Sequence, residues 1–287
     1  MSAAFGSIRC ASNSAPLAAT AAADRLMRAW STRQWISRIE DFPAAPADVA
    51  QMYAVHLAMQ NHPLAGSLGG LGGYKIGAVG AEGEACLYAP LFRDFLVEAK
   101  GRAGALPLSA EAIQMHQVEP EFSVVMGEDV PPRTDGQPHA PSDVWARIDH
   151  VALSIECCGQ RCTPDVAAAL AAATSKLGKF QDALLCGGCV LGKRLHGCDG
   201  DALASCETSL SVNGEVVSRG SGAACPEGGP VGALSWLANH LNARGLMLRK
   251  GQLVATGQTC IHRGIVAGDT VVASFGNHGE IEMVIAP

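Results

Sequence analysis

The stretch HQVEPEFSVVMG (residues 116–127) reads as a strand that carries two acids on one face. Side chains along a strand alternate between its two faces. Glu119, Glu121 and Ser123 therefore share one face, and the opposite face is apolar, with Val118, Phe122, Val124 and Met126. The two glutamates fit either a solvated acidic edge or a pair of ligands for a cation.

The composition is typical of a globular enzyme. The chain has 287 residues, of which 48% are hydrophobic and 17% charged, so it is long enough to bury a large core. Its formal net charge of −6 and pI of about 5.8 argue against a nucleic-acid surface. No apolar run reaches the length of a membrane span. The sequence therefore predicts neither a nucleic-acid nor a membrane partner.

The chain is rich in cysteine, with eleven in total. Cys186 and Cys189 form one CxxC pair in CGGC, but the cysteines of CCGQRC (residues 157–162) supply no clean second pair for a zinc site. Buried cysteine also behaves as a small hydrophobe. We expect reduced thiols, with a structural zinc ion or a redox pair as the less favoured alternative.

The first residues differ from the rest of the chain. Residues 1–19 are rich in Ala and Ser and contain one Arg and no acid, which predicts a disordered tail or a weak transit peptide. We expect a single domain over residues 20–287. The expected location is cytoplasmic, with organelle targeting as the alternative.

Hydrophobic periodicity predicts an α+β fold. Helices are expected at residues 21–34, 46–62 and 230–245, and a short strand at Tyr74–Ile76. Residues 82–99 fit no single pattern. After about residue 115 a mostly antiparallel β-core is expected, with a hairpin at Asn213-Gly214 and a closing hairpin at residues 277–279. The glycine-rich stretch 66–77 lacks the spacing of a nucleotide-binding loop.

A third acid extends the opening motif. Glu156 lies in the strand-like segment VALSIECC (residues 151–158), on the same face as Ala152 and Ser154. If this strand lies beside residues 117–126, three carboxylates converge and repel one another unless a cation balances them. All-oxygen ligands suit Mg²⁺, Mn²⁺ or Ca²⁺. The alternative is three solvated strand glutamates.

Eight segments follow one another in an order that matches a known family. They are GYKIG (73–77), VEPEFSVVMG (118–127), ALSIE (152–156), QDALLCGGCVLG (181–192), VNGEVVSRGSGAA (212–224), LSWLANHL (234–241), LVATG (253–257) and GDTVVASFG (268–276). Over about residues 20–287 the chain resembles the fumarylacetoacetate hydrolase superfamily, in the branch of 2-oxopent-4-enoate hydratases and 4-oxalocrotonate decarboxylases.

The resemblance implies a fold and a metal centre. The fold is a mixed β-roll core with a helical N-terminal part. The implied cofactor is Mg²⁺ or Mn²⁺, and its implied ligands are Glu119, Glu121 and Glu156. The implied substrate is a small 2-oxo acid, and the implied assembly is a homo-oligomer.

The resemblance also implies roles for four other residues. Lys75 matches the active-site lysine and Asp182 an acidic residue of the pocket. Thr256 and Gly257 match a turn near the substrate carboxylate. From the residues alone, Lys75 is either an exposed lysine without a role or a functional group, and the flanking Gly73 and Gly77 favour the second because they permit a close backbone approach. A helix-end acid at Asp182 and a satisfied strand hydroxyl at Thr256 remain the alternatives.

The chemistry agrees with these roles. A 2-oxo acid chelates a cation, which acts as a Lewis acid and stabilises an enolate. Hydration of a 2-hydroxydienoate and decarboxylation both pass through such an enolate. Lys75 and Asp182 are ionisable groups that a buried site tunes toward neutral pH for proton transfer.

Several positions depart from the family pattern. Polar residues of the family pattern are replaced at Val79, Gly80, Gly159, Ala183 and Gln258, and a leucine is replaced by Ala78, whereas Arg161 is kept. No histidine–glutamate pair marks the water-activating dyad of the hydrolase branch, and we interpret His62 and His150 as structural.

Three functions are compatible with these residues. The first is a metal-dependent lyase, either a hydratase of a 2-hydroxydienoate or a decarboxylase of a 2-oxo diacid. The second is a C–C hydrolase (acylpyruvase) or tautomerase of the same fold. The third is a non-catalytic metal-binding member of the family. The three glutamates together with Lys75 argue against the third function, and the missing histidine–glutamate pair makes C–C hydrolysis less favoured than the lyase.

Overall fold

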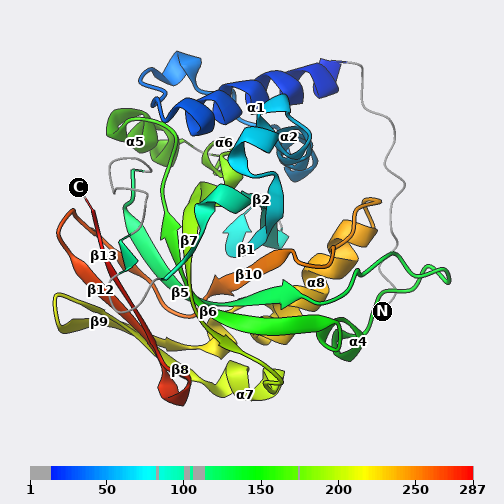
Figure 1. Cartoon of the computed structure of the whole chain (residues 1–287). Coiled ribbons are helices and arrows are strands. Elements are labelled where there is room, and N and C mark those ends of the chain that lie inside the picture. The colour runs from blue at the N-terminus through cyan, green and yellow to red at the C-terminus, as the bar shows by residue number, and fades with distance from the viewer. Residues whose placement is uncertain (1–13, 82–83, 100–103, 106–113, 174, 287) are drawn as a thin grey trace.

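Helices pack against two β-sheets in an α+β arrangement (Figure 1), as predicted. The computed structural model describes residues 14–81, 84–99, 104–105, 114–173 and 175–286. The helices at one end of the molecule are α1 (Ser14–Thr32), α2 (Val49–Gln60), α5 (Pro164–Ala172) and α6 (Leu177–Phe180). Those towards the other end are α4 (Pro141–Trp145), α7 (Gly200–Ser205) and α8 (Pro230–Asn242).

The larger sheet has the strand order β2-β1-β10-β5-β6-β7-β3. The short strand β11 also pairs with β5, at residues Gln117 and Val118, before the part of β5 that pairs with β10. Its strands are β1 (Leu71–Ala81), β2 (Glu84–Phe92), β3 (Leu96–Glu98), β5 (Gln117–Met126), β6 (Ile148–Cys158), β7 (Cys186–Leu195), β10 (Leu253–Gln258) and β11 (His262–Arg263). Most pairs are antiparallel, but β1 with β10 and β3 with β7 are parallel. Strand β5 thus lies in the middle of this sheet.

The smaller sheet has the order β4-β13-β12-β8-β9. Its strands are β4 (Gly104–Ala105), β8 (Glu207–Val212), β9 (Glu215–Ser221), β12 (Thr270–Phe275) and β13 (Glu280–Val284). The β8–β9 hairpin turns at Asn213 and Gly214, whose φ angles of 52° and 88° are those of the predicted type I′ turn.

Strand β5 alternates as expected, but neither of its faces meets solvent. The predicted apolar face is in the core, and none of its four side chains is more than 1% exposed. Glu119 and Glu121 on the other face are only 7% and 1% exposed. The interpretation of a solvated acidic edge is therefore wrong.

Strand β1 approaches β10 closely. Gly73 lies opposite Leu253 and Lys75 opposite Ala255 in this parallel pair. Gly73 has a φ of 154°, and a Cβ there would overlap the carbonyl oxygen of Leu253. The sequence predicted that Gly73 permits a close backbone approach, and the structure shows that the approaching backbone is that of β10. This contact places Lys75 next to Ala255 of β10.

The predicted helices are confirmed, and two other expectations need correction. Residues 82–99 fitted no pattern, and their described part contains β2 and β3, joined by a 3₁₀ turn at Arg93–Phe95. The segment before residue 115 is therefore not only helical, since β1 and β2 belong to the main sheet. Helix α1 begins at Ser14, inside the stretch 1–19 expected to form a tail, and residues 1–13 lie outside the described residues.

No helix among the described residues combines the length and the apolar character that a membrane span requires.

We predict that His56 makes the fold sensitive to acid. Its ring in α2 is buried, with Nδ1 3.2 Å from the carbonyl oxygen of Tyr88 and Nε2 3.2 Å from that of Phe180. Burial lowers the pKa of His56 to about 4, although both carbonyls oppose this effect. Between pH 6.5 and 4 the unfolded chain binds a proton that the folded chain does not. The free energy of unfolding therefore decreases as the pH is lowered through this range, by about 3 kcal/mol in total.

The measurement is the free energy of unfolding in urea at pH 7 and at pH 4.5. His56→Gln is expected to flatten the pH dependence, and the control His196→Gln, on an exposed residue, is expected to keep it. An unchanged slope in His56→Gln would contradict the prediction.

Candidate metal centre and active site

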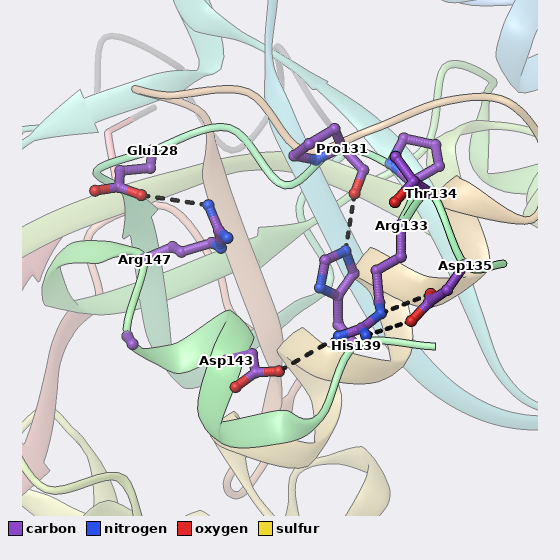
Figure 2. Close-up of a pocket in the computed structure, with 10 residues that line it drawn as sticks. Glu128, Pro131, Arg133, Thr134, Asp135, His139, Asp143 and Arg147 are labelled. Carbon is purple, nitrogen blue, oxygen red and sulfur yellow. Dashed lines mark hydrogen bonds and ion pairs between the residues drawn. The ribbon is translucent and has the colours of Figure 1, made fainter. Parts of the chain in front are cut away.

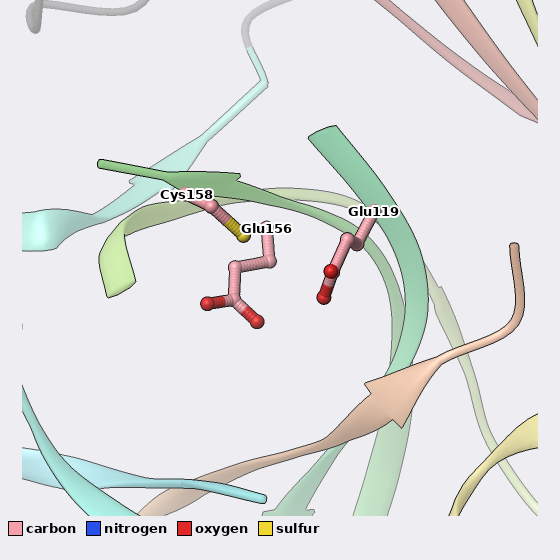
Figure 3. Close-up of side chains that lie close together, drawn as sticks. All are labelled: Glu119, Glu156 and Cys158. Carbon is pink, nitrogen blue, oxygen red and sulfur yellow. The ribbon is translucent and has the colours of Figure 1, made fainter. Parts of the chain in front are cut away.

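The register of β5 and β6 brings two of the predicted ligands together. Glu119 and Glu156 are direct cross-strand partners, and Glu121 lies opposite Ser154. Carboxylate oxygens of Glu119 and Glu156 and the sulfur of Cys158 all lie within 4.8 Å of one another (Figure 3). Glu121 lies next to this group and not within it.

Each predicted ligand has one oxygen held by a protein donor. Lys75 Nζ donates to Glu156 Oε1 at 2.5 Å, and the Gly257 amide donates to Glu121 Oε2 at 3.2 Å. The Gln117 amide donates to Glu119 Oε1. Glu156 Oε2 and Glu121 Oε1 are buried and have no hydrogen-bond partner in the described part of the chain.

Two unpartnered carboxylate oxygens in a buried site are costly, because a buried acceptor normally finds a donor or a cation. The hydrogen bonds fix the orientation of each carboxylate and leave its other oxygen available, as outer partners do in metal sites. The donor set is mostly oxygen. The residues therefore fit a divalent cation such as Mg²⁺ or Mn²⁺.

Burial makes the charged forms of these glutamates costly. Burial raises the pKa of Glu119 to about 7, and the nearby Glu156 adds to the effect. Burial and the charge of Glu156 also raise the pKa of Glu121 well above its usual value. A divalent cation beside them would favour the charged forms.

Lys75 keeps its proton in this environment. It is 5% exposed, which excludes the interpretation of an exposed lysine. Burial is the largest single influence and lowers its pKa, but the surrounding acidic groups, with Glu156 first among them, together outweigh burial, and the pKa lies well above its usual value. The expectation that the site tunes Lys75 toward neutral pH is therefore wrong, and Lys75 acts as an ammonium group.

Asp182 lies in a different set of contacts from those of Lys75. Its carboxylate accepts hydrogen bonds from Arg161 Nε at 2.7 Å, from the Arg161 amide at 2.9 Å and from Trp30 Nε1 at 3.3 Å. Both members of this ion pair are buried. The next three residues, Ala183–Leu185, all have positive φ angles of 46°, 50° and 66°. Asp182 thus anchors a strained turn that leads into β7.

Thr256 and Gly257 lie at the end of β10 beside β5. The Thr256 hydroxyl donates to the carbonyl oxygen of Phe122 at 2.7 Å, so the alternative of a satisfied strand hydroxyl is met. The Gly257 amide points at Glu121. Contact of either residue with a substrate stays a prediction.

The histidines considered in the sequence have other partners. His62 Nε2 lies 3.2 Å from Asp24, and His150 Nδ1 lies 2.7 Å from Asp149. No histidine pairs with a glutamate in the described part of the chain. The structural interpretation of both is supported.

Sequence reasoning missed Gln117 and Cys158. Gln117 lies two residues before Glu119, and Cys158 two residues after Glu156, so period-two alternation alone places each on the same face as its glutamate. No disulfide joins any of the ten described cysteines, and Cys10 lies outside the described residues. Their reduced state stays a prediction.

A surface hollow elsewhere contains none of the predicted residues (Figure 2). It is lined by Glu128, Pro131, Pro132, Arg133, Thr134, Asp135, His139, Asp143, Ala146 and Arg147. Its charges pair among themselves, as in Arg133 with Asp135 at 2.5 Å and Arg147 with Glu128 at 3.3 Å. It offers no unpaired group comparable to those around Glu156.

Comparison with known proteins identifies relatives in one group of enzymes. No protein-family model matches the chain. It is 38% identical over 79 residues to 2-keto-4-pentenoate hydratase of Burkholderia vietnamiensis, which covers 28% of this chain and 30% of that protein. It is 29% identical over 182 residues to 2-keto-4-pentenoate hydratase of Paraburkholderia xenovorans, covering 63% and 62%. The matches span less than two thirds of these curated relatives.

Solved structures extend the likeness to nearly the whole chain. The fold matches 4-oxalocrotonate decarboxylase from Pseudomonas putida G7, complexed with calcium and acetate, with a TM-score of 0.74 and 22% identity over 96% of this chain and 99% of that chain. It also matches fumarylpyruvate hydrolase from Pseudomonas aeruginosa, in complex with Mn²⁺ and pyruvate, with a TM-score of 0.54 and 16% identity over 75% and 89%. The chain is thus similar in sequence to 2-keto-4-pentenoate hydratases over part of its length, and it shares its α+β fold with these solved structures.

Proposed function

We propose that the protein is a divalent-cation-dependent lyase that acts on a small 2-oxo acid. The observation that carries the proposal is the pair of buried, unpartnered oxygens on Glu121 and Glu156 beside the Lys75 ammonium. The hydratase names of the curated relatives support a lyase, and the divalent metals bound to the solved neighbours support the cation.

In this proposal Glu119, Glu121 and Glu156 hold the cation, which is Mg²⁺ or Mn²⁺. The bound cation would polarise the carbonyl of the 2-oxo acid and lower the cost of negative charge on it. Gln117, Lys75 and the Gly257 amide keep the three carboxylates oriented. Their hydrogen bonds are preformed, so the site is not reorganised when the substrate arrives.

Lys75 Nζ is the group that carries a proton in this site. Its raised pKa keeps it protonated, so it serves as a hydrogen-bond donor and as a positive charge at the substrate oxygen, and not as a resting base. Thr256 and Gly257 are proposed to lie near the substrate carboxylate. The catalytic role of Asp182 stays a prediction, and its contacts with Arg161 support a positioning role.

Hydration of a 2-hydroxydienoate is the proposed reaction, with decarboxylation of a 2-oxo diacid as the second candidate. The decarboxylase is favoured by the fold match over 96% of the chain, and the hydratase by the sequence relatives. C–C hydrolysis is less favoured, because no histidine–glutamate dyad accompanies the carboxylates in the described part of the chain.

The test compares three substrates with metal-stripped and reloaded protein. Loss of 2-hydroxypenta-2,4-dienoate absorbance reports hydration, release of carbon dioxide from a 2-oxo diacid reports decarboxylation, and cleavage of an acylpyruvate is the hydrolase control. Activity on the first or second substrate that returns with Mg²⁺ or Mn²⁺ supports the proposal. Cleavage of the acylpyruvate alone would refute the lyase, and no turnover with metal bound would favour a non-catalytic protein.

We predict that Glu121→Gln weakens Mn²⁺ binding by at least about 10-fold, since loss of even an outer partner of a metal site costs about 10- to 100-fold. Glutamine mimics the protonated carboxyl and still accepts the Gly257 hydrogen bond, so the fold is retained. Calorimetric titration with Mn²⁺ measures the effect. Glu128→Gln, on an exposed residue, is the control. If the variant with all three glutamates changed to glutamine binds Mn²⁺ like the wild type, the centre lies elsewhere.

A further inference from the structure

Cys158 belongs to the same cluster as the two facing glutamates. It lies two residues after Glu156 in β6, on the same face of the strand, and is 3% exposed. Its sulfur and the nearest carboxylate oxygens of Glu119 and Glu156 lie within 4.8 Å of one another. Figure 3 shows the three side chains converging from two neighbouring strands.

A second observation points to a shared ligand in this cluster. Glu156 Oε2 is fully buried and unpartnered, while its other oxygen is held by Lys75. The Gln117 amide lies 3.6 Å from the Cys158 sulfur and also donates to Glu119. One side chain thus orients both a sulfur and a carboxylate of the cluster.

The chemistry of sulfur changes what such a centre prefers. Carboxylates alone suit Mg²⁺, Ca²⁺ and Mn²⁺, whereas a thiolate favours softer cations such as Zn²⁺, and Co²⁺ and Cd²⁺ serve as probes of such sites. Ligand atoms about 2.0–2.3 Å from one cation lie about 3.5 Å apart in a tetrahedral site.

We propose that Cys158 is a further ligand of the cation in this centre, beside Glu119 and Glu156, and that it raises the affinity of the site for thiophilic divalent cations above what the carboxylates alone give. The proposal rests on the cation site of the proposed function and deepens it. As the metal–sulfur bond forms, the S–H bond breaks and its proton passes to solvent. No oxidation is involved.

The experiment is a titration of the full chain with Co²⁺, followed by its absorption spectrum. A thiolate bound to Co²⁺ gives an intense near-ultraviolet charge-transfer band, which carboxylate ligands do not give. The band is expected in the wild type and absent from Cys158→Ala. The matched control is Cys157→Ala, which removes a buried thiol from the opposite face of the same strand and is expected to keep the band.

Calorimetry with Cd²⁺ and Mg²⁺ gives a readout that does not depend on activity. Cys158→Ala is expected to lose at least about 10-fold in Cd²⁺ affinity and to keep the Mg²⁺ affinity of the wild type. Cys158→Ala and its control Cys157→Ala both keep the partly exposed Cys198 and Cys206. A difference in Cd²⁺ affinity between these two variants therefore reports Cys158.

The outcomes separate this proposal from the proposed function. Cobalt that binds without the near-ultraviolet band, or a band that persists in Cys158→Ala, overturns the thiolate ligand and leaves the carboxylate centre standing. Failure of the wild type to bind any of Co²⁺, Cd²⁺, Mn²⁺ and Mg²⁺ overturns the proposed function, and the thiolate ligand with it.

Discussion

Replacing Lys75 with methionine is expected to lower turnover by about 10²- to 10³-fold, the range that removing one preorganised donor at developing negative charge costs. Methionine keeps an unbranched chain of similar length in the buried position and removes only the ammonium. The loss should appear in kcat, because the ammonium acts on charge that develops during the reaction.

The same change should not weaken the cation site. Lys75 Nζ lies 2.5 Å from Glu156 Oε1, so its positive charge competes with a divalent cation for that carboxylate. Without the ammonium, Glu156 offers both oxygens, and Mn²⁺ affinity is expected to hold or rise. Lower turnover with undiminished metal binding separates a role in the reaction from a role in building the site.

Two measurements on the same preparations test this expectation, namely kcat with the preferred lyase substrate and calorimetric Mn²⁺ affinity. The matched control is Lys193→Met, which removes an exposed lysine that donates to the carbonyl oxygen of His278, and it should leave both values unchanged. A Lys75→Met protein that keeps wild-type kcat would remove Lys75 from the reaction. A fall in both values would assign Lys75 to the assembly of the centre.

Strand alternation predicted part of this site and could not supply the rest. The period of two was enough to place Glu119 and Glu121 on one face and the apolar residues on the other. It said nothing of register, and a shift of one residue between β5 and β6 would have moved Glu156 to the opposite face. Pairing of Glu119 with Glu156 is a property of the assembled sheet.

The fold was predicted where one periodicity dominated. The helix at 46–62 has a clear apolar stripe at Met52, Val55 and Met59, and all three are buried. Residues 82–99 carry apolar residues too densely for either period to stand out, as is common in strands buried on both faces. Their strands are set by pairing with β1 and β7, and a local pattern does not report which strands will pair.

The surroundings of Asp182 lay beyond local sequence rules. Arg161 lies 21 residues before it, with α5 and α6 in between, and the turn Ala183–Leu185 that follows Asp182 has three consecutive positive φ angles. Alanine and leucine disfavour that conformation by about 1–2 kcal/mol per residue, so no propensity scale indicates a turn there. Tertiary contacts must hold it in place.

Arg161 provides those contacts, and we predict that Arg161→Ala lowers the free energy of unfolding by about 3–5 kcal/mol, the cost of leaving one partner of a buried ion pair alone. Its guanidinium donates to Asp182 Oδ1 at 2.7 Å, to the Asp182 carbonyl oxygen at 2.8 Å and to the Cys186 carbonyl oxygen at 2.7 Å. It thus joins both ends of the strained turn. It also lies 4.1 Å from the centre of the Trp30 ring, which adds a cation–π contact.

Urea unfolding at neutral pH measures this effect, and two further variants show its origin. Arg161→Lys keeps the charge but lacks the planar fork that reaches three oxygens, so it should recover only part of the lost stability. Arg147→Ala removes a half-exposed arginine paired with Glu128 and should cost no more than about 0.5 kcal/mol. If Arg161→Ala is as stable as Arg147→Ala, the turn at Ala183–Leu185 is held by other contacts, and Asp182 becomes free to serve the reaction directly.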